Sequence, residues 1–288
     1  MKNKLKHLVP VLLALATITG SLSACELKPK AQQKVSKQGF YFDTIIQITL
    51  YGTTDEKYID DCFDMAKKYE DMLSNTVSYS EVSKINDAAG KEYVTVSDDT
   101  LELIKNGIEY GDTSDGRFDI TIGKLSDLWN FSEIAENTDS KDNEVDASVV
   151  PSDAQIQSEL SHVNYRNIQI NGNDVMLTDS KAKLDLGGIA KGFIADKMKA
   201  YLQSKKITSG IINLGGNVLT VGEKSDGSDY TVGIQKPFDE SGEPICTVKI
   251  KDKSVVTSGI YERYYRVDGK LYHHILDTTT GYPVKNNL

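Results

Sequence analysis

Several features that mark large classes of protein are scarce or missing in this sequence. Its 33 basic and 42 acidic residues give a formal net charge of −9, so the chain lacks the basic excess typical of nucleic-acid binding and does not attract anionic lipid. Neither the dinucleotide fingerprint GxGxxG nor the phosphate loop GxxxxGKS/T occurs. The adjacent histidines His273 and His274 would point to opposite faces of a strand, so they form no zinc motif. We therefore expect no nucleic-acid partner.

Cysteine is also scarce, with only Cys25, Cys62 and Cys246 in the chain. Cys62 lies within the helical pattern YIDDCFDMAKKYEDML, and we expect it to be a buried free thiol. An exported chain could instead pair Cys62 with Cys246, an alternative that the sequence leaves open.

An apolar run near the N-terminus predicts export. Three lysines precede LVPVLLALATI, and the segment ends in Leu-Ser-Ala-Cys at Cys25. The run is short for a transmembrane helix, and small residues leading into a cysteine are typical of a lipoprotein signal. We expect a signal peptide at 1–24, lipidation of Cys25, a polar tether at 25–38 and attachment to the extracytoplasmic face of the cell membrane. A plain cleaved signal and a membrane anchor helix are the alternatives.

The rest of the chain, residues 39–288, is expected to form one α+β domain with a largely antiparallel central sheet flanked by helices. Alternating apolar residues predict one half-buried strand over 40–51. Asn137 to Asp153 is acidic and predicts a surface insertion. The patterns predict helices at 57–74, 100–114, 152–163 and 188–206, strands at 183–186, 210–222, 230–235, 246–250 and 254–258, and hairpins at 167–178 and 264–276.

The segment LDLGGIAKG, residues 184–192, combines a paired glycine turn with charges of both signs. The glycines let a backbone approach a ligand closely, and the start of the following helix offers N–H groups to an anion. Asp185 and Lys191 bring one charge of each sign. We interpret the segment as a site for a phosphate-bearing ligand; a tight turn beside a surface lysine is the alternative.

Three further segments carry weaker signals. Asp119 to Thr121 place a carboxylate and a hydroxyl on a turn close to Trp129, which we expect in the core. The polar stretch 74–86 could face a ligand or water. The second glycine pair, Gly215 and Gly216, suits close approach of a flat ring or a phosphate, and a β-bulge explains it equally well.

The segment HHILDTTTGYP, residues 273–283, places Asp277 and three threonines directly after a strand. A carboxylate with hydroxyl and carbonyl oxygens is the donor set that Mg²⁺ prefers. An Asx or threonine turn is the structural alternative.

Five segments, taken in order, resemble motifs of the ApbE family, the FAD:protein FMN transferases, and the resemblance extends from about Phe40 to Val284. These segments are DGRFDITIG, LDLGGIAKG, INLGGN, VVTSG and HHILDTTTGYP. The resemblance implies an α+β fold and an Mg²⁺-dependent transferase. Such an enzyme cleaves the FAD pyrophosphate, attaches FMN to a threonine or serine of a partner flavoprotein and releases AMP. The resemblance also implies an acceptor in a membrane-side electron-transfer system. Family members are often exported lipoproteins, which agrees with Cys25.

The resemblance also assigns roles to individual residues. It implies His274 as the proton acceptor, with Asp277 and Lys191 as further catalytic residues. The metal ligands it implies are the Gly188 carbonyl, Asp277 and Thr280, with Gly281 as the adjacent alternative. The FAD contacts it implies are Phe42, Thr76, Asp119, Ile120, Thr121, Asp185, Lys191, Gly215, Gly216 and Ser258.

The chain departs from the family pattern in four places. Asp43 replaces a small glycine, Thr76 replaces an aromatic residue, and Thr278 replaces a proline, which we expect to loosen its turn slightly. The chain ends at Leu288, before a further helix and strand of the family, so we expect an incomplete C-terminal end. An FAD pyrophosphatase that yields FMN and AMP, and a non-catalytic flavin-binding lipoprotein, are the alternative functions.

Overall fold

The computed structural model describes residues 33–138, 143–239 and 241–285. These residues belong to one compact unit, Gln33–Leu288. The expected signal peptide and the lipidation at Cys25 lie outside the described residues. Within them, no helix has the length and apolar character needed to cross a bilayer.

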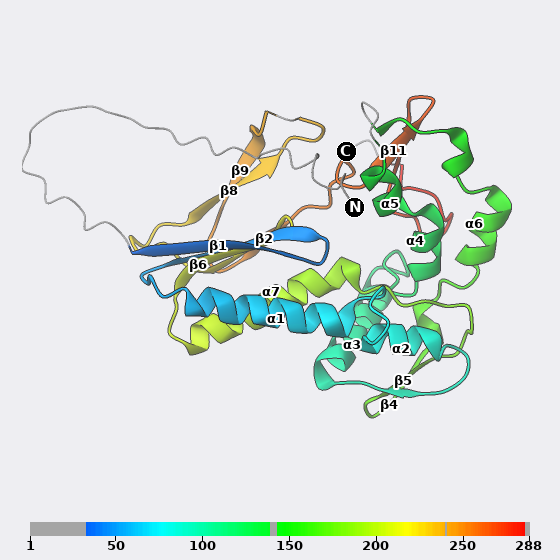
Figure 1. Cartoon of the computed structure of the whole chain (residues 1–288), viewed down its shortest axis with the longest axis horizontal. Helices are drawn as coiled ribbons and strands as arrows, with labels where there is room; N and C mark the ends of the chain where they lie inside the picture. Colours follow the sequence, from blue (N-terminus) through cyan, green and yellow to red (C-terminus); the bar gives the residue numbers. More distant parts are fainter. Residues whose placement is uncertain (1–32, 139–142, 240, 286–288) are drawn as a thin grey trace, which may run out of the picture. The chain divides into compact units, whose positions relative to one another are not determined.

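A five-stranded antiparallel sheet forms the centre of the unit (Figure 1). This confirms the expected α+β fold with an antiparallel central sheet. Its strands lie in the order β1-β2-β6-β7-β10, namely β1 (Lys34–Tyr41), β2 (Thr44–Tyr51), β6 (Ser209–Leu214), β7 (Asn217–Gly222) and β10 (Ser254–Val256).

The expected single strand over 40–51 is wrong, because the segment turns back on itself. Phe42 and Asp43 both have φ +54°, the left-handed conformation that suits a tight hairpin turn. Strand β1 begins at Lys34, inside the segment expected to be a tether, because Val35 is buried and pairs with Leu50. The polar residues around Val35 hid this strand from a reading based on apolar alternation.

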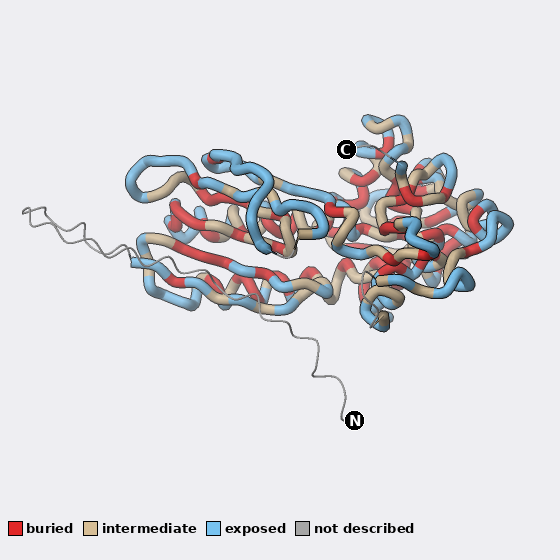
Figure 2. The backbone as a smooth tube through the Cα atoms, turned by 90° about the horizontal axis from the view of Figure 1, so that it is seen from above, coloured by how far each residue is buried: buried red, intermediate tan, exposed pale blue. Residues whose placement is uncertain are grey.

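Helices α1 (Lys57–Leu73) and α7 (Gly187–Ser204) lie along one side of the sheet, and α3 (Asp98–Thr113) packs against α7 to complete this helical layer (Figure 1). Ile46 and Ile48 of β2 are fully buried in the core beneath this layer, and Figure 2 shows such positions in red. Cys62 is buried there as a free thiol, as expected, and burial raises its pKa to about 12. Cys246 is free and exposed.

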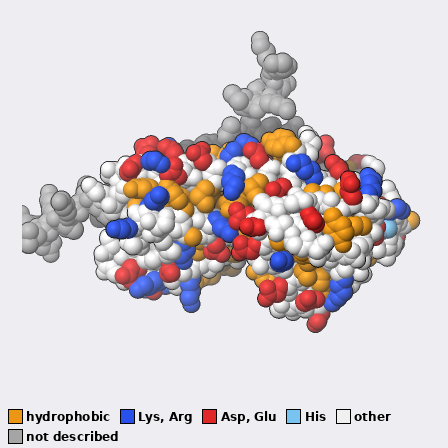
Figure 3. Space-filling model, turned by 90° about the horizontal axis from the view of Figure 1, so that it is seen from below, with side chains coloured by type: hydrophobic (Ala, Val, Ile, Leu, Met, Phe, Trp, Pro, Cys, Tyr) orange, Lys and Arg blue, Asp and Glu red, His pale blue; other side chains and the backbone are white. Residues whose placement is uncertain are grey.

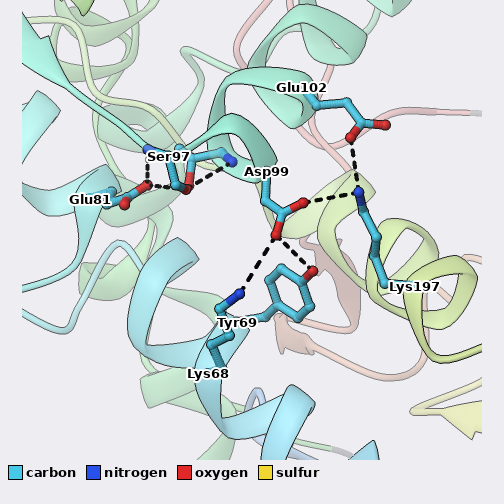
Figure 4. A network of polar contacts seen from close by, with 8 residues as sticks. Lys68, Tyr69, Glu81, Ser97, Asp99, Glu102 and Lys197 are labelled. Atoms are coloured by element: carbon cyan, nitrogen blue, oxygen red, sulfur yellow. Dashed lines mark hydrogen bonds and ion pairs between the residues drawn. The ribbon is translucent and has the colours of Figure 1, made fainter. Parts of the chain in front are cut away.

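Asp99, in the first turn of α3, joins the three helices (Figure 4). Its carboxylate accepts a hydrogen bond from the Tyr69 hydroxyl at 3.0 Å and lies 3.7 Å from the Lys68 ammonium, both on α1. Lys197 of α7 pairs with Asp99 at 2.9 Å and with Glu102 at 3.0 Å. These contacts stabilise the layer that carries α7.

The beginning of α7 differs from the expectation. The predicted strand over 183–186 is wrong, since only one parallel bridge, Ile122 to Lys183, forms there. The Asp185 Oδ1 atom accepts a hydrogen bond from Gly187 N at 2.8 Å, which turns the chain directly into the helix. The first glycine therefore belongs to the helix.

A second core is mostly aromatic. Trp129 is fully buried, as expected, and its ring stacks on Phe131 with centroids 5.5 Å apart. Phe131 stacks on Tyr265, which stacks on Tyr272. The elements around it are α4 (Gly123–Trp129), α5 (Phe131–Glu136), α6 (Asp153–Leu160) and the hairpin β11 (Tyr264–Val267) to β12 (Lys270–His273).

The described part of the expected surface insertion is attached to this second core. Val145 N donates to Arg266 O at 2.9 Å, and Val145 packs against the aromatic residues. The other elements in the described residues are α2 (Glu81–Asp87), the small sheet of β3 (Val94–Thr95), β5 (Asp174–Leu177) and β4 (Ile168–Asn171), and the hairpin β8 (Tyr230–Gln235) to β9 (Pro244–Ile250). Short 3₁₀ helices lie at Ala147–Val149 and Tyr165–Asn167.

Acidic and basic side chains alternate on the face shown in Figure 3. No large area of one sign dominates that view.

Candidate active site

The start of α7 places the first candidate residues. Gly187 N is capped by the Asp185 carboxylate, and Asp185 N donates to Ile120 O at 2.8 Å. A Cβ atom at Gly188 would lie 3.0 Å from the Phe118 ring, so the glycine permits this close packing. The glycine pair thus has a structural role, and it also keeps the backbone accessible to a ligand.

Lys191 lies half-buried one turn into α7. Burial lowers the pKa of its ammonium, and the positive charge of Arg263 lowers it further, while Glu262 and Asp185 act in the opposite direction. Among the described residues, no carboxylate lies within 4.0 Å of the Lys191 ammonium. A partly desolvated cation without a contacting carboxylate is well suited to bind an anion.

A tight glycine turn lies near the charges that surround this lysine. Gly215 and Gly216 connect β6 to β7 with φ of +58° and +88°. A Cβ atom on Gly215 would lie 2.5 Å from the Thr44 hydroxyl, so the turn packs closely against the hairpin that carries Phe42. A Cβ atom on Gly216 would lie 3.8 Å from Glu262, which places this turn next to the charges around Lys191.

His274 is held in one tautomer by the backbone of Arg263. The Arg263 carbonyl accepts from His274 N at 3.1 Å and from the ring Nδ1 at 3.3 Å. Because a carbonyl only accepts, Nδ1 carries the proton and Nε2 keeps a lone pair. Burial lowers the pKa of His274 to about 4, and the nearby charges of Arg263 and Lys191 contribute. The imidazole is therefore neutral at physiological pH.

The neighbouring His273 has a different role. It is buried, its Nε2 lies 3.1 Å from the Val284 carbonyl, and its Nδ1 accepts from Ile275 N at 3.3 Å. Both ring nitrogens are thus used within the fold. This leaves His274 as the candidate base of the pair.

Asp277 opens the turn that follows β12. Its Oδ1 accepts from the Thr279 hydroxyl at 2.6 Å and from Thr279 N at 2.7 Å, so the Asx turn is present. These bonds, and then the charge of Arg117, lower the pKa of Asp277, and its carboxylate is ionised at neutral pH. Thr280 is exposed, while the Gly281 carbonyl accepts from Trp129 Nε1 at 2.8 Å.

The donors implied for a metal are all oxygen atoms: the Asp277 carboxylate, the Thr280 hydroxyl and the Gly188 carbonyl. This chemistry fits Mg²⁺, which prefers hard oxygen ligands. Within the described ranges, no group of three or more His, Cys, Asp or Glu side chains is placed to hold a metal ion. A metal site here would therefore depend on hydroxyl and carbonyl donors beside the carboxylate.

Other expected contacts lie deeper or further out. Asp119 and Thr121 are buried; Asp119 accepts from Thr121 N, the Thr121 hydroxyl and Tyr165 N at 2.8, 2.6 and 2.9 Å. Ile120 is fully buried and its carbonyl accepts from Asp185 N, so Ile120 is the one of the three that contacts Asp185 directly among the described hydrogen bonds. Ser258 and Thr76 are exposed, and no described hydrogen bond joins Thr76 to the cluster around Lys191.

Glu262 and Arg263 were not predicted as site residues. Both act electrostatically on Lys191, and the Arg263 carbonyl also fixes His274. Their one sequence signal is a pair of opposite charges between VVTSG and the hairpin.

The chain is similar to several known proteins. A model of the ApbE family matches residues 42–288. A Klebsiella pneumoniae protein named FAD:protein FMN transferase is 37% identical over 245 residues, covering 84% of this chain and 72% of the relative. A Vibrio cholerae protein of the same name is 30% identical over 280 residues, covering 96% and 80%. The crystal structure of the ApbE protein from Thermotoga maritima matches with TM-score 0.78 and 32% identity, covering 88% of this chain and 79% of that one.

Proposed function

This chain belongs to the ApbE family, and on that premise we propose that it is an Mg²⁺-dependent FAD:protein FMN transferase. It breaks the pyrophosphate bond of FAD, forms a phosphoester between FMN and a threonine or serine hydroxyl of a partner flavoprotein, and releases AMP. The observation that carries the proposal is that Lys191, a partly desolvated cation, lies within electrostatic reach of the neutral His274.

His274 serves as the general base. Its Nε2 lone pair accepts the proton of the acceptor hydroxyl as that oxygen attacks phosphorus. The Arg263 carbonyl holds the ring in the tautomer that this role requires. The lowered pKa keeps the base unprotonated over the physiological range.

Lys191 contributes positive charge where the pyrophosphate binds. Phosphoryl transfer depends mainly on positioning and charge stabilisation, and a partly desolvated ammonium interacts more strongly with phosphate than an exposed one does. Asp185 caps the helix that carries Lys191 and also lies within electrostatic reach of it.

Asp277, Thr280 and the Gly188 carbonyl are the residues that would hold Mg²⁺. When bound, the ion would neutralise charge on the pyrophosphate. Asp277 is ionised in advance, because the Thr279 hydrogen bonds lower its pKa. The exposed Thr280 hydroxyl is the second ligand in this proposal, and the Gly281 carbonyl, which accepts from the buried Trp129, is the adjacent alternative.

The flavin and the nucleotide would be bound along the glycine turns. Phe42, Gly215 and Gly216 lie on two turns that pack together through Thr44. Phe42 N donates to Glu70 Oε1 at 2.8 Å, which anchors its turn to α1. Ile120 holds Asp185 through its carbonyl, and the hydrogen bonds between Asp119 and Thr121 stabilise the turn that carries Ile120.

The chain is proposed to act at the membrane. The signal sequence and Cys25 support lipid anchoring at the extracytoplasmic face. An acceptor within a membrane-side electron-transfer system would be within reach of an enzyme held there.

The proposal is tested by mixing purified residues 26–288 with FAD and Mg²⁺, with and without a threonine-bearing flavoprotein, and following AMP release. Acceptor-dependent AMP release is expected. AMP release that does not depend on the acceptor would instead indicate an FAD pyrophosphatase. Tight FAD binding without AMP release would indicate a flavin-binding protein.

A further inference from the structure

Thr278 makes a long-range contact that its neighbours in the Asp277 turn do not make. Its hydroxyl donates to the Gly116 carbonyl at 2.7 Å, across 162 positions of sequence. The expectation that threonine here loosens the turn took no account of this bond. A proline at the same position could not donate it.

The loop that receives this hydrogen bond, residues 115–118, is firmly attached to α3. Gly116 N donates to Gly111 O at 2.8 Å, and Phe118 N donates to the Ser114 hydroxyl at 2.9 Å. Asp115 and Gly116 have φ of +53° and +77°, which reverse the chain directly after the helix. Thr278 is therefore bonded to a loop that is itself fixed.

The same loop contacts both places that supply the implied metal donors. Phe118 packs against the α7 start, where a Cβ on Gly188 would lie 3.0 Å from its ring. Arg117 acts electrostatically on Asp277. The loop thus connects the Gly188 carbonyl and the Asp277 carboxylate, which come from different parts of the chain.

The remaining bonds of the turn lie mainly toward its far end. Gly281 N donates to Asp277 O at 2.7 Å, and Trp129 Nε1 donates to Gly281 O at 2.8 Å. Gln157 Nε2 donates to Thr280 O at 3.4 Å. None of these bonds joins the turn to the loop beside Gly188.

We propose that Thr278 is a positioning residue, whose hydroxyl fixes the position of the Asp277 carboxylate relative to the start of α7. It preorganises the oxygen donors for Mg²⁺ without being a ligand itself. This inference rests on the function proposed for the site. Because a preorganised site loses less free energy on binding an ion, removing the hydroxyl should weaken metal binding while FAD binding is retained.

The test compares Thr278→Val, which keeps the shape and loses the donor, with Thr278→Ser, which keeps the donor. Thr178→Val is the matched control, because the Thr178 hydroxyl also donates to a backbone carbonyl, that of Asn167, at 3.1 Å. Three quantities are measured for each variant: the Mg²⁺ concentration that half-saturates AMP release, Mn²⁺ affinity without FAD by electron paramagnetic resonance, and the metal-free melting temperature.

Thr278→Val is expected to raise the half-saturating Mg²⁺ concentration and to weaken Mn²⁺ binding, each by about fivefold, which corresponds to the loss of one hydrogen bond. Thr278→Ser should restore most of the affinity, and Thr178→Val should leave both metal constants unchanged.

A lower melting temperature in Thr278→Val with unchanged metal constants would show a purely structural role and overturn the inference. Equal Mn²⁺ binding in all variants, including no binding in any, would also overturn it. If the wild-type chain releases no AMP, the proposed function fails, and the Mn²⁺ measurement still decides the role of Thr278.

Discussion

The two cores of the chain are built from different side chains and support different parts of the candidate site. The first core, between the central sheet and α1, α3 and α7, is mainly aliphatic, with Ile46, Ile194 and Met198 fully buried. It carries Lys191 and the two glycine turns. The second core is mainly aromatic, built around Trp129, and carries His274 and Asp277 at its edge.

Under the proposed function, the first core contributes mainly to ligand binding and the second mainly to the chemistry. Regular elements of the first core present backbone turns and one cation, which suit recognition of a phosphate-bearing ligand. The second core presents a base and a carboxylate on a hairpin and its following turn, where stacked rings limit movement. Substitutions in each core should therefore have separable effects.

The largest expected effect comes from Asp277→Ala. Removing the carboxylate should lower transfer by about 10³-fold, because it would remove an ionised metal ligand. The fold should persist, since the side-chain bonds of Asp277 go to the exposed Thr279. Asp146→Ala is the matched control, because Asp146 makes a similar turn to Ser148 N at 2.9 Å. Retained Mg²⁺-dependent transfer in Asp277→Ala would contradict the assignment of Asp277 as a metal ligand.

Trp129→Ala tests whether the second core supports the chemistry. It should destabilise the chain by about 3–5 kcal/mol, because it leaves a large cavity, and it removes the bond to the Gly281 carbonyl. Ile194→Ala, in the first core, should cost about 2–4 kcal/mol and leave the Mg²⁺ requirement unchanged. For each variant, denaturant unfolding measures the stability loss, and Mg²⁺ titration below the melting temperature measures the Mg²⁺ requirement. The comparison fails if the two variants shift the Mg²⁺ requirement equally.

Lys191→Gln tests the contribution of the first core to phosphate binding. Loss of a partly desolvated positive charge should lower kcat/KM for FAD by about 10²-fold. Lys199→Gln, on the same helix, removes a lysine that pairs with Asp252 at 2.8 Å and should have little effect. An equal loss in the two variants would show that overall charge, and not the position of Lys191, matters.

The pH dependence of kcat/KM reports on His274. With its pKa lowered to about 4, the free enzyme should keep its activity from pH 7 to pH 5. With a histidine of ordinary pKa as the base, activity would fall about 25-fold over that range. An acid limb near pH 6.5 would contradict the pKa that burial lowers at His274.

The same pKa shift affects stability. The unfolded chain binds the His274 proton below pH 6.5, and the folded chain binds it only near pH 4. Stability should therefore fall as the pH is lowered through this window.

Asp99→Asn has the smallest expected effect and concerns the first core alone. Burial raises the pKa of Asp99, but bonds from Lys197 and Tyr69 outweigh this and lower it overall. The carboxylate therefore stabilises the fold above its ordinary pKa, and this contribution is lost as the pH falls through the lowered value. Asp99→Asn should cost about 1 kcal/mol at pH 7, with unchanged kcat. A cost that persists after Asp99 is protonated would point to a cause other than its charge.

The local elements were predictable where capping or periodicity defines them. Ser97 caps α3, and Ser152 forms a capping box with Gln155 at α6, both near positions that the sequence predicts. The hairpin turn at Asp268-Gly269 also forms, with φ of +50° and +73°. Strand β1 was missed because its exposed positions are polar, and only pairing with β2 makes it a strand.

The site was predictable only in part, because several of its interactions depend on tertiary structure. The family motifs single out Lys191, His274 and Asp277. They do not predict the tautomer of His274, which depends on the Arg263 carbonyl. Nor do they predict the bond from Thr278 to Gly116, since it joins segments far apart in the sequence.

The central claim is transfer of FMN to a protein hydroxyl. The most direct measurement is intact mass spectrometry of the flavoprotein acceptor after incubation with this chain, FAD and Mg²⁺. A second acceptor, in which the receiving threonine is replaced by alanine, is the control. The account predicts one covalent FMN on the first acceptor, none on the control, and an equal amount of AMP. Release of AMP with neither acceptor labelled would contradict it.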